Sequence, residues 1–509
     1  MRLIDNLDRG AMIAPRSTCL SQDGRTLNFR ATVIASHAVA AQLAARGVGP
    51  GDVVATIGAN SLDYMIAVLG IVRSGATWLP LNVRYAGDEL RHSVTSNDCV
   101  FALCAAPQLD MMRKVFGGGA EAEARLLCID DLDHGSAGTD LGDGPDQGPE
   151  TIVAIRSTGG TTGPSKGVMI SNRNYETLFA TLFSTLPLPR DPVHLAIAPL
   201  SHAAGSLAWA MMPHGGRTEV MARFDAAEVL RRIESERVTH IFLTPTMLYM
   251  LLDCSELENH DYSSLHTVIY SGAPMSVEKL KRAIAAFGPV FAQAYGQAEA
   301  PFFCAILKPE DHMPVDDPVV ARRLASCGRP TLFTRVEIMD DEGRLLGPGA
   351  RGEIVVRGEI VMQGYYNNPA ATEKAGRHGW HHTGDIGYKD EDGFLFIVDR
   401  ERDVIISGGF NIFPTEIEQV IWSHPAVQDC AVIGVPDDLW GEAVKAVIEL
   451  TPDATLDPEE IVGLCAERLG RMKAPKSVDI WPSLPRSPVG KVLKRDIRAK
   501  YWEGRDRAV

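Results

Sequence analysis

Apolar runs of strand length alternate with amphipathic stretches across about the first 400 residues of the chain. The run at residues 53–57 precedes helix-like spacing at 61–72, and the run at 240–243 precedes similar spacing at 246–252. A further strand-like run covers 151–156, after a connector at 134–150 that is rich in glycine and aspartate. This alternation predicts α/β layers with a substantial parallel sheet.

The pattern changes after a charged cluster at residues 399–403, which separates apolar runs at 394–398 and 404–407. Thr415 and Glu418 fit a capping box at a helix start, and Asp457-Pro458 opens a second helix. Strand-like runs at 429–435 and 443–450 lie between them. We therefore expect a large N-terminal α/β domain of several subdomains at 1–401 and a small α+β domain at 402–509.

Composition excludes several classes of function. The chain has 65 acidic and 50 basic residues, a net charge of −15, which argues against a general binder of nucleic acid or anionic membranes. Its nine cysteines are scattered without a C-x-x-C pair and predict free thiols in a reducing compartment, not a zinc site. The apolar segment at 65–79 contains Arg73 and is too short to span a bilayer, and the N-terminus lacks a secretory signal. We expect a cytoplasmic protein without a membrane span, whose oligomeric state the sequence does not give.

The strongest local signal is Ser157-Thr-Gly-Gly-Thr-Thr-Gly-Pro-Ser-Lys166-Gly167, directly after a predicted strand. Glycines let the backbone approach an anion closely, while hydroxyls and a lysine supply donors and charge. The segment differs from the usual P-loop, because Lys166 precedes Gly167 and no Ser or Thr follows the lysine. Phosphate binding is the preferred interpretation, and a flexible linker is the alternative.

Five further segments follow in order. They are Ser271-Gly-Ala-Pro274, Tyr295-Gly-Gln-Ala-Glu299, Thr383-Gly-Asp385, the stretch from Asp399 through Gly408-Gly409 to Glu418, and Pro485-Arg-Ser-Pro-Val-Gly-Lys491. Together with the glycine-rich loop, their order and spacing closely resemble the adenylate-forming superfamily. That superfamily comprises acyl-CoA synthetases, aryl-CoA ligases, luciferases and nonribosomal adenylation domains. The resemblance runs from about residue 27 to residue 500.

The resemblance implies an enzyme that uses ATP and Mg²⁺ to convert a carboxylic acid into its acyl-adenylate, with coenzyme A as the acyl acceptor. Lys491, Glu299, Thr158 and Lys166 would be catalytic, and Glu299 would ligate Mg²⁺. A cation that bridges the attacking carboxylate and the α-phosphate offsets their repulsion, which is the role implied for Lys491. Residues implied to bind ATP are Ser157, Thr158, Gly159, Gly160, Thr161, Thr162, Gly163, Lys166, Gly272, Ala273, Pro274, Tyr295, Gly296, Asp385, Arg400 and Lys491.

The remaining implied residues serve the acid, the acceptor and domain movement. The small domain would be mobile about a hinge at Arg402, with Gly408, Gly409 and Lys473 at the acceptor tunnel. The implied acid contacts are His202, Ala203, Leu207, Ser271, Gly272, Gly296 and Ala300. They include no Lys or Arg, which favours a hydrophobic monocarboxylic acid over a dicarboxylate.

One position departs from the family pattern. Ala298 stands where a Thr or Ser usually precedes the metal-binding glutamate, so one phosphate contact is missing or comes from elsewhere, such as Thr161 or Thr162. Two alternatives to an acyl-CoA ligase stay open: amide formation with an amine or amino acid acceptor, and a non-catalytic nucleotide binder. The adjacent His381 and His382 do not predict a metal site, since neighbouring strand residues point apart.

Overall fold

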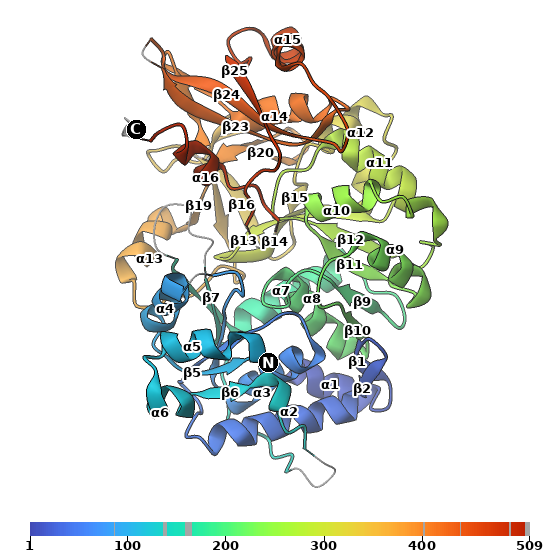
Figure 1. Ribbon diagram of the computed structural model, residues 1–509, viewed down its shortest axis with the longest axis vertical. Coiled ribbons are helices and arrows are strands. Elements are labelled where there is room, and N and C mark those ends of the chain that lie inside the picture. Colours follow the sequence, from blue (N-terminus) through green and yellow to red (C-terminus); the bar gives the residue numbers. More distant parts are fainter. Residues whose placement is uncertain are drawn as a thin grey trace.

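The computed structural model describes residues 1–85, 87–135, 140–157, 165–400, 403–437, 439–487 and 490–503. Figure 1 shows a large N-terminal part at one end of the long axis and a smaller C-terminal part at the other. This confirms the predicted fold class, a large α/β domain followed by a small domain. No helix of the described ranges has the length and apolar character needed to cross a bilayer.

The largest sheet has nine strands in the order β15-β14-β13-β12-β11-β9-β10-β1-β2. Its strands β9 to β13 are parallel neighbours, whereas β14 and β15 run antiparallel at one edge. The strands are β1 (Thr18–Gln22), β2 (Arg25–Asn28), β9 (Val193–Ala196), β10 (Arg217–Val220), β11 (His240–Leu243), β12 (Thr267–Tyr270), β13 (Phe291–Gln297), β14 (Ala300–Leu307) and β15 (Arg329–Pro330).

A second sheet has seven strands in the order β18-β8-β7-β4-β3-β5-β6. The strands are β3 (Val53–Ile57), β4 (Thr77–Pro80), β5 (Cys99–Cys104), β6 (Leu126–Cys128), β7 (Ile152–Ser157), β8 (Gly167–Ser171) and β18 (Gly364–Tyr365). A four-stranded antiparallel sheet follows in the order β16-β17-β19-β20. It consists of β16 (Arg335–Met339), β17 (Gly352–Arg357), β19 (His381–Lys389) and β20 (Leu395–Arg400).

The fourth sheet belongs to the small domain, and its strands all start at residue 405 or later. They are β21 (Ile405–Ser407), β22 (Phe410–Ile412), β23 (Val427–Asp437), β24 (Gly441–Leu450) and β25 (Ser477–Trp481). The helices of the chain are α1 (Asp5–Ile13), α2 (Phe29–Ala44), α3 (Leu62–Ser74), α4 (Gly87–Ser96), α5 (Leu109–Val115), α6 (Gly119–Ala124), α7 (Asn172–Thr185), α8 (Ala203–Met211), α9 (Ala226–Ser235), α10 (Pro245–Leu252), α11 (Val277–Phe287), α12 (Pro318–Arg323), α13 (Pro369–Ala375), α14 (Pro414–Trp422), α15 (Pro458–Leu469) and α16 (Lys494–Ala499).

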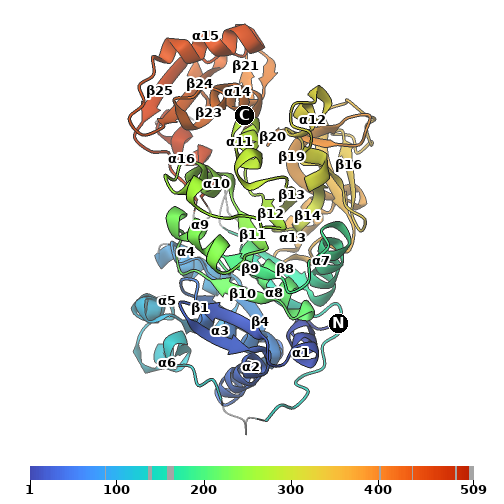
Figure 2. The same cartoon turned by 90° about the vertical axis from the view of Figure 1, so that its right-hand side faces the viewer.

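Buried strands of both large sheets carry apolar side chains on both faces. In β11, Phe242 packs into the core between the two sheets, while Ile241 and Leu243 pack on the opposite face. The first core includes residues of α2, α3, α7 and α8, and the second includes residues of α9, α10 and α11. Because successive strand residues point to opposite faces, a continuous apolar run marks a strand covered on both sides. Figure 2 shows these helices around the sheets from the side.

The capping box predicted at Thr415 and Glu418 is wrong. The helix α14 already begins at Pro414, so Thr415 lies inside its first turn and cannot be the cap. Asp399 at the end of the large domain instead accepts hydrogen bonds from the backbone N–H and the hydroxyl of Thr415, at 3.1 and 3.3 Å. Glu418 is buried and pairs with Lys494 at 2.8 Å. The predicted cap at Asp457 is confirmed, since its carboxylate accepts from the N–H of Glu459.

Candidate functional site

The glycine-rich segment connects two antiparallel neighbours. Strand β7 ends at Ser157, β8 begins at Gly167, and these two residues lie opposite each other in the sheet. Gly167 is required by packing, because a Cβ there would lie 1.9 Å from Oδ1 of Asn97. The predicted phosphate ligands Thr158, Gly159, Gly160, Thr161, Thr162 and Gly163 lie outside the described residues, as does the predicted hinge residue Arg402.

A tyrosine joins two of the predicted catalytic residues. Glu299 lies on the turn between β13 and β14, and its Oε1 accepts a hydrogen bond of 2.8 Å from the hydroxyl of Tyr365. Nζ of Lys166 lies 4.7 Å from the centre of the same ring. Burial first, and then the charge of Glu299, raise the pKa of Tyr365, so the hydroxyl remains a donor. Sequence reasoning missed Tyr365, and nothing in the short Gly364-Tyr365 strand marks it.

A second carboxylate is held in a similar way. Asp385 on β19 accepts a hydrogen bond of 2.8 Å from the hydroxyl of Tyr295 on β13, and Nε of Arg400 lies 3.2 Å from its other oxygen. Asp385 and Arg400 face each other because they are register partners in neighbouring strands. Burial and the nearby Asp385 raise the pKa of Tyr295. The carboxylate keeps lone pairs that could accept hydrogen bonds from hydroxyl groups of a ligand.

The wall beside Tyr295 is formed where two parallel strands end. Ser271 follows β12, and its hydroxyl donates to the carbonyl of Ala294 on β13 at 2.6 Å. Gly272 has a φ of +91° and open space around its Cα, which leaves this backbone accessible. The next residues, Ala273 and Pro274, are not buried. The carboxyl ends of neighbouring parallel strands are where ligands of open α/β sheets usually bind.

Two of the predicted acid contacts, Ala203 and Leu207, lie on α8, and His202 directly precedes it. His202 occupies the N-cap position of α8 without a side-chain capping bond, and its Nδ1 contacts the hydroxyl of Ser201 at 2.8 Å. Burial, with a smaller effect of Arg156, lowers the pKa of His202 to about 4. Leu207 packs in the central core together with Ala294, and Ala203 packs against that core. Ala300 packs instead in the cluster around Tyr295.

Arg156 is a basic residue near this helix that the sequence did not assign. One terminal nitrogen, Nη2, donates to the hydroxyls of Tyr175 at 2.7 Å and Ser206 at 3.2 Å. Its charge acts on His202. Its position in a strand-like run gave no hint of these partners, which come from α7 and α8.

The loop that carries Lys491 lies against the large domain. The carbonyl of Gly490 accepts a hydrogen bond of 3.0 Å from Thr246, in the first turn of α10. Arg486, at the other end of the loop, donates to the same Thr246 hydroxyl and pairs with Asp429 at 2.7 Å. The backbones of Ser487 and Lys491 are joined by a hydrogen bond of 2.7 Å. These bonds hold the backbone next to Lys491 against α10, the helix that follows β11.

The predicted acceptor residues lie on the small domain. Gly408 and Gly409 have φ values of +56° and +81° at the turn of the β21–β22 hairpin. A Cβ at Gly408 would lie 2.6 Å from the Trp440 ring, so this position also requires glycine. Nζ of Lys473 pairs with Glu416, which Arg351 of the large domain also contacts, at 2.9 Å.

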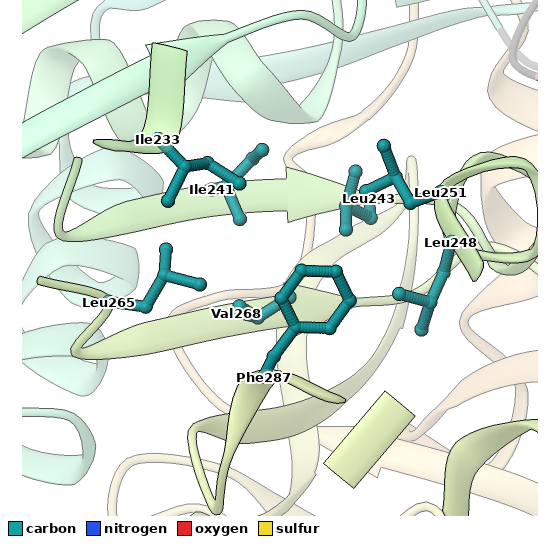
Figure 3. A pocket seen from close by; sticks show the side chains of 8 residues that line it. All are labelled: Ile233, Ile241, Leu243, Leu248, Leu251, Leu265, Val268 and Phe287. Carbon is teal, nitrogen blue, oxygen red and sulfur yellow. The ribbon is translucent and has the colours of Figure 1, made fainter. Parts of the chain in front are cut away.

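An apolar pocket lies under α10 (Figure 3), and none of the predicted site residues lines it. Its lining has no polar side chain and consists of Ile233, Ile241, Leu243, Leu248, Leu251, Leu265, Val268 and Phe287. These residues form part of the core on the outer face of the nine-stranded sheet. The pocket offers no group for catalysis. The described residues also contain no cluster of three or more His, Cys, Asp or Glu that could hold a metal ion.

Comparison with known proteins gives consistent matches. The family model for AMP-binding enzymes matches residues 7–366, and the model for their C-terminal domain matches residues 416–491. A feruloyl-CoA synthase of Amycolatopsis is 34% identical over 97% of this chain and 98% of its own. A medium/long-chain-fatty-acid–CoA ligase of Mycobacterium tuberculosis is 43% identical, over 71% of this chain and 63% of its own. The solved structure of an amide bond synthetase from Marinactinospora thermotolerans superposes with a TM-score of 0.87 at 30% identity, covering 98% of this chain and 100% of that one.

Proposed function

This chain belongs to the AMP-binding enzyme family, and from that premise we propose that it is an AMP-forming acyl-CoA ligase. It activates a hydrophobic monocarboxylic acid with ATP to give the acyl-adenylate and pyrophosphate. It then transfers the acyl group to coenzyme A. The named activities of the two relatives, feruloyl-CoA synthase and fatty-acid–CoA ligase, support this assignment.

The observation that carries the proposal is the pair of carboxylates held by tyrosines. Asp385 is bound by Tyr295 on β13, and Glu299 lies on the turn that follows β13, so both carboxylates belong to the region where β13 ends. Asp385 would accept the ribose hydroxyls, with Arg400 beside the ribose and α-phosphate. Lys166 would supply positive charge to the phosphates.

Glu299 fits a Mg²⁺ site of the kind that nucleotides bring with them. Mg²⁺ prefers oxygen ligands and is commonly held by one or two carboxylates together with substrate phosphates. The hydrogen bond from Tyr365 orients the Glu299 carboxylate and leaves its second oxygen for a ligand. When bound, the ion would neutralise charge on the phosphates. The side chain of Ala298 is a methyl group and cannot donate a hydrogen bond there. It packs against the central core.

The chemistry proceeds in two steps. A carboxylate oxygen of the acid attacks the α-phosphorus, and the bond to the β-phosphate oxygen breaks, so that pyrophosphate leaves. Lys491 would stabilise the charge that develops between the two anions, as the contact of Gly490 with Thr246 brings its loop to the large domain. The thiol of coenzyme A then attacks the acyl carbonyl, loses its proton, and AMP leaves.

The acceptor path runs through the small domain in this proposal. Gly408 and Gly409 would line it, and a turn at Arg402 would carry Lys491 away and bring this face to the adenylate. Lys473 pairs with Glu416 in the structure, so contact with a phosphate of coenzyme A requires that ion pair to open. The domain limits at 401 and 402 remain a prediction.

The similarity to an amide bond synthetase makes an amine the second acceptor class to test. The amide bond synthetase superposes on nearly the whole chain, and both reactions share the adenylation step. The experiment incubates the enzyme with Mg-ATP and a panel of hydrophobic acids, with coenzyme A or amines as acceptor. Acid-dependent AMP and pyrophosphate together with a thioester product support the proposal, and an amide product supports the alternative. Absence of AMP with every acid and acceptor, despite ATP binding, contradicts both.

Asp385→Asn tests the nucleotide site within the same assay. It should raise the KM for ATP about tenfold or more with a much smaller effect on the KM for the acid, because a charged acceptor is lost. Asp392→Asn is the matched control, since Asp392 is exposed and contacts only surface groups such as Arg323, at 3.0 Å. Equal KM values for ATP in both variants would contradict the assignment of Asp385.

A further inference from the structure

Arg156 carries a charge that the described part of the protein does not neutralise. It lies near the end of β7, and its side chain reaches the hydroxyls of Tyr175 and Ser206 through Nη2. Its Nε is buried and has no hydrogen-bond partner among the described residues. No ion pair joins it to a carboxylate of the described residues, although the residue as a whole is partly exposed.

This charge lies beside the surface proposed for the acid. Arg156 donates to Ser206 on α8, and its charge acts on His202, which occupies the N-cap position of the same helix. Tyr175 belongs to the same apolar core as Leu207 and Ala294. Arg156 therefore lies beside α8, the helix that carries the predicted acid contacts Ala203 and Leu207.

A guanidinium in such surroundings needs acceptors. Moving its charge into an apolar region without partners is costly. The two hydroxyls that it contacts are neutral and satisfy only one of its nitrogens. A ligand with an oxygen atom at this depth would satisfy the buried Nε or the remaining terminal nitrogen.

We propose that Arg156 is a specificity residue, and that the acid carries a second hydrogen-bond-accepting oxygen at the end remote from its reacting carboxylate. A hydroxyl, keto or carboxylate oxygen on an otherwise hydrophobic body meets this requirement. The proposal rests on the proposed function and refines its substrate class: hydroxy and keto acids lie within the hydrophobic monocarboxylic acids, whereas an ω-carboxy acid would extend that class to dicarboxylates. Arg156 is thus a polar contact of the acid beside the apolar contacts on α8, and the sequence did not indicate it.

The test compares matched acids in the pyrophosphate-release assay with the full-length enzyme. The acids are hexanoic, octanoic and decanoic acid with their ω-hydroxy, ω-oxo and ω-carboxy counterparts, and phenylpropanoic acid with its para-hydroxy counterpart. The readout is the ratio of kcat/KM for each oxygenated acid to that for its plain partner. In the wild type, the best pair should give a ratio of about 10 or more, as expected for a hydrogen bond to a charged group.

Arg156→Met, which keeps the length of the side chain without its charge, should lower that ratio about 10- to 100-fold. Arg156→Lys should keep part of it. Tyr175→Phe is the matched control, because it removes a partner of Arg156 but leaves the guanidinium, so the ratio should stay high. Thermal unfolding of each variant separates loss of specificity from loss of fold, and the wild-type ratios decide the question if Arg156→Met does not fold.

The outcomes are separate from those of the proposed function. Ratios near one for every pair in an active wild type overturn the inference and leave the ligase assignment intact. An equal loss of rate with all acids in Arg156→Met also overturns it, since that result would place Arg156 at the reacting carboxylate or in the fold. A preference for the ω-hydroxy, ω-oxo or ω-carboxy acid supports the inference and identifies the oxygen. Failure of every acid to release pyrophosphate contradicts the proposed function itself.

Discussion

Tyr365 and Glu299 are joined by a hydrogen bond of 2.8 Å, although they belong to different sheets. Tyr365 sits on the edge strand of the seven-stranded sheet, and Glu299 sits on a turn of the nine-stranded sheet. The proposed metal ligand is therefore oriented by an element of the opposite layer. Its position depends on how the two sheets pack.

Tyr365→Phe removes this hydrogen bond and should lower the rate of adenylation about tenfold, because bonds to charged groups contribute about 1.5–3 kcal/mol. It should also raise the Mg²⁺ concentration that gives half the maximal rate. Pyrophosphate release measured against Mg²⁺ concentration checks both effects. Tyr366→Phe is the control, since the Tyr366 hydroxyl contacts Asp98 at 3.3 Å, at the surface. Equal effects of the two variants would contradict a role for Tyr365 in positioning Glu299.

Lys491→Ala should slow adenylation about 100-fold or more, the usual loss when one group that stabilises developing charge is removed. ATP binding should change less than adenylation, because the other proposed nucleotide contacts lie on the large domain. Thioester formation from a synthetic acyl-adenylate should be retained, because that step does not use the lysine. The two half-reactions are measured separately, with Lys500→Ala as an exposed control near the same end of the chain. Loss of both half-reactions would point to a structural role.

Lys494→Met should destabilise the small domain by about 3–5 kcal/mol, since it leaves the buried carboxylate of Glu418 without its partner. Burial raises the pKa of Glu418, which Lys494 counteracts. The double variant Lys494→Met/Glu418→Gln should recover part of the loss. Calorimetric unfolding provides the measurement. Lys500→Met is the matched control, because Lys500 only covers the Trp481 ring, at 3.8 Å. An equal shift of the unfolding temperature in both single variants would argue against the pair.

Acid should destabilise the large domain through two buried histidines. His194 and His240 lie opposite each other in β9 and β11, and burial lowers their pKa values to about 4 and about 3 from 6.5. Both are neutral in the folded protein, while the unfolded chain binds protons below pH 6.5. Their stabilisation is complete above that pH and is lost as the pH falls from 6.5 towards 4.

Urea unfolding at pH 7.5, 6 and 5 tests this histidine effect. His240→Phe keeps a ring beside His266 but cannot take up a proton, so its midpoint should fall less steeply with decreasing pH than that of the wild type. Parallel curves for the two proteins would show that His240 does not contribute to the acid sensitivity.

The sequence predicted those elements well that depend only on residues close together in the chain. The strand at 53–57 and the helix after it, the strand at 240–243, and the cap at Asp457 all appear as expected. The error at Thr415 and Glu418 arose because their partners come from elsewhere: Asp399 from β20 and Lys494 from α16. A capping pattern in sequence cannot show that a better acceptor arrives from another strand.

The candidate site shows the same difference: its residues could be predicted from the sequence, but their contacts with distant elements could not. The order of the motifs predicted Tyr295, Glu299 and Asp385 as site residues, but the contacts of Tyr295 with Asp385 and of Glu299 with Tyr365 follow only from the way in which different sheets pack together. Arg156 was missed for the same reason. In the sequence it is one polar residue at the end of an apolar run, and only the packing of α7 and α8 shows what surrounds it.

The pairing of Ser157 with Gly167 has a consequence for the length of the segment between them. Antiparallel partners lie about 5 Å apart, so both ends of the glycine-rich segment are anchored at one point of the sheet. In a P-loop the chain instead leaves a strand and enters a helix, whose amide groups help to bind phosphate. Here the number of residues between the two anchors limits how far the segment can extend from the sheet. A deletion between the anchors would shorten the reach of the segment, whereas a deletion within β8 would slip the pairing by one position and turn the following side chains towards the wrong face.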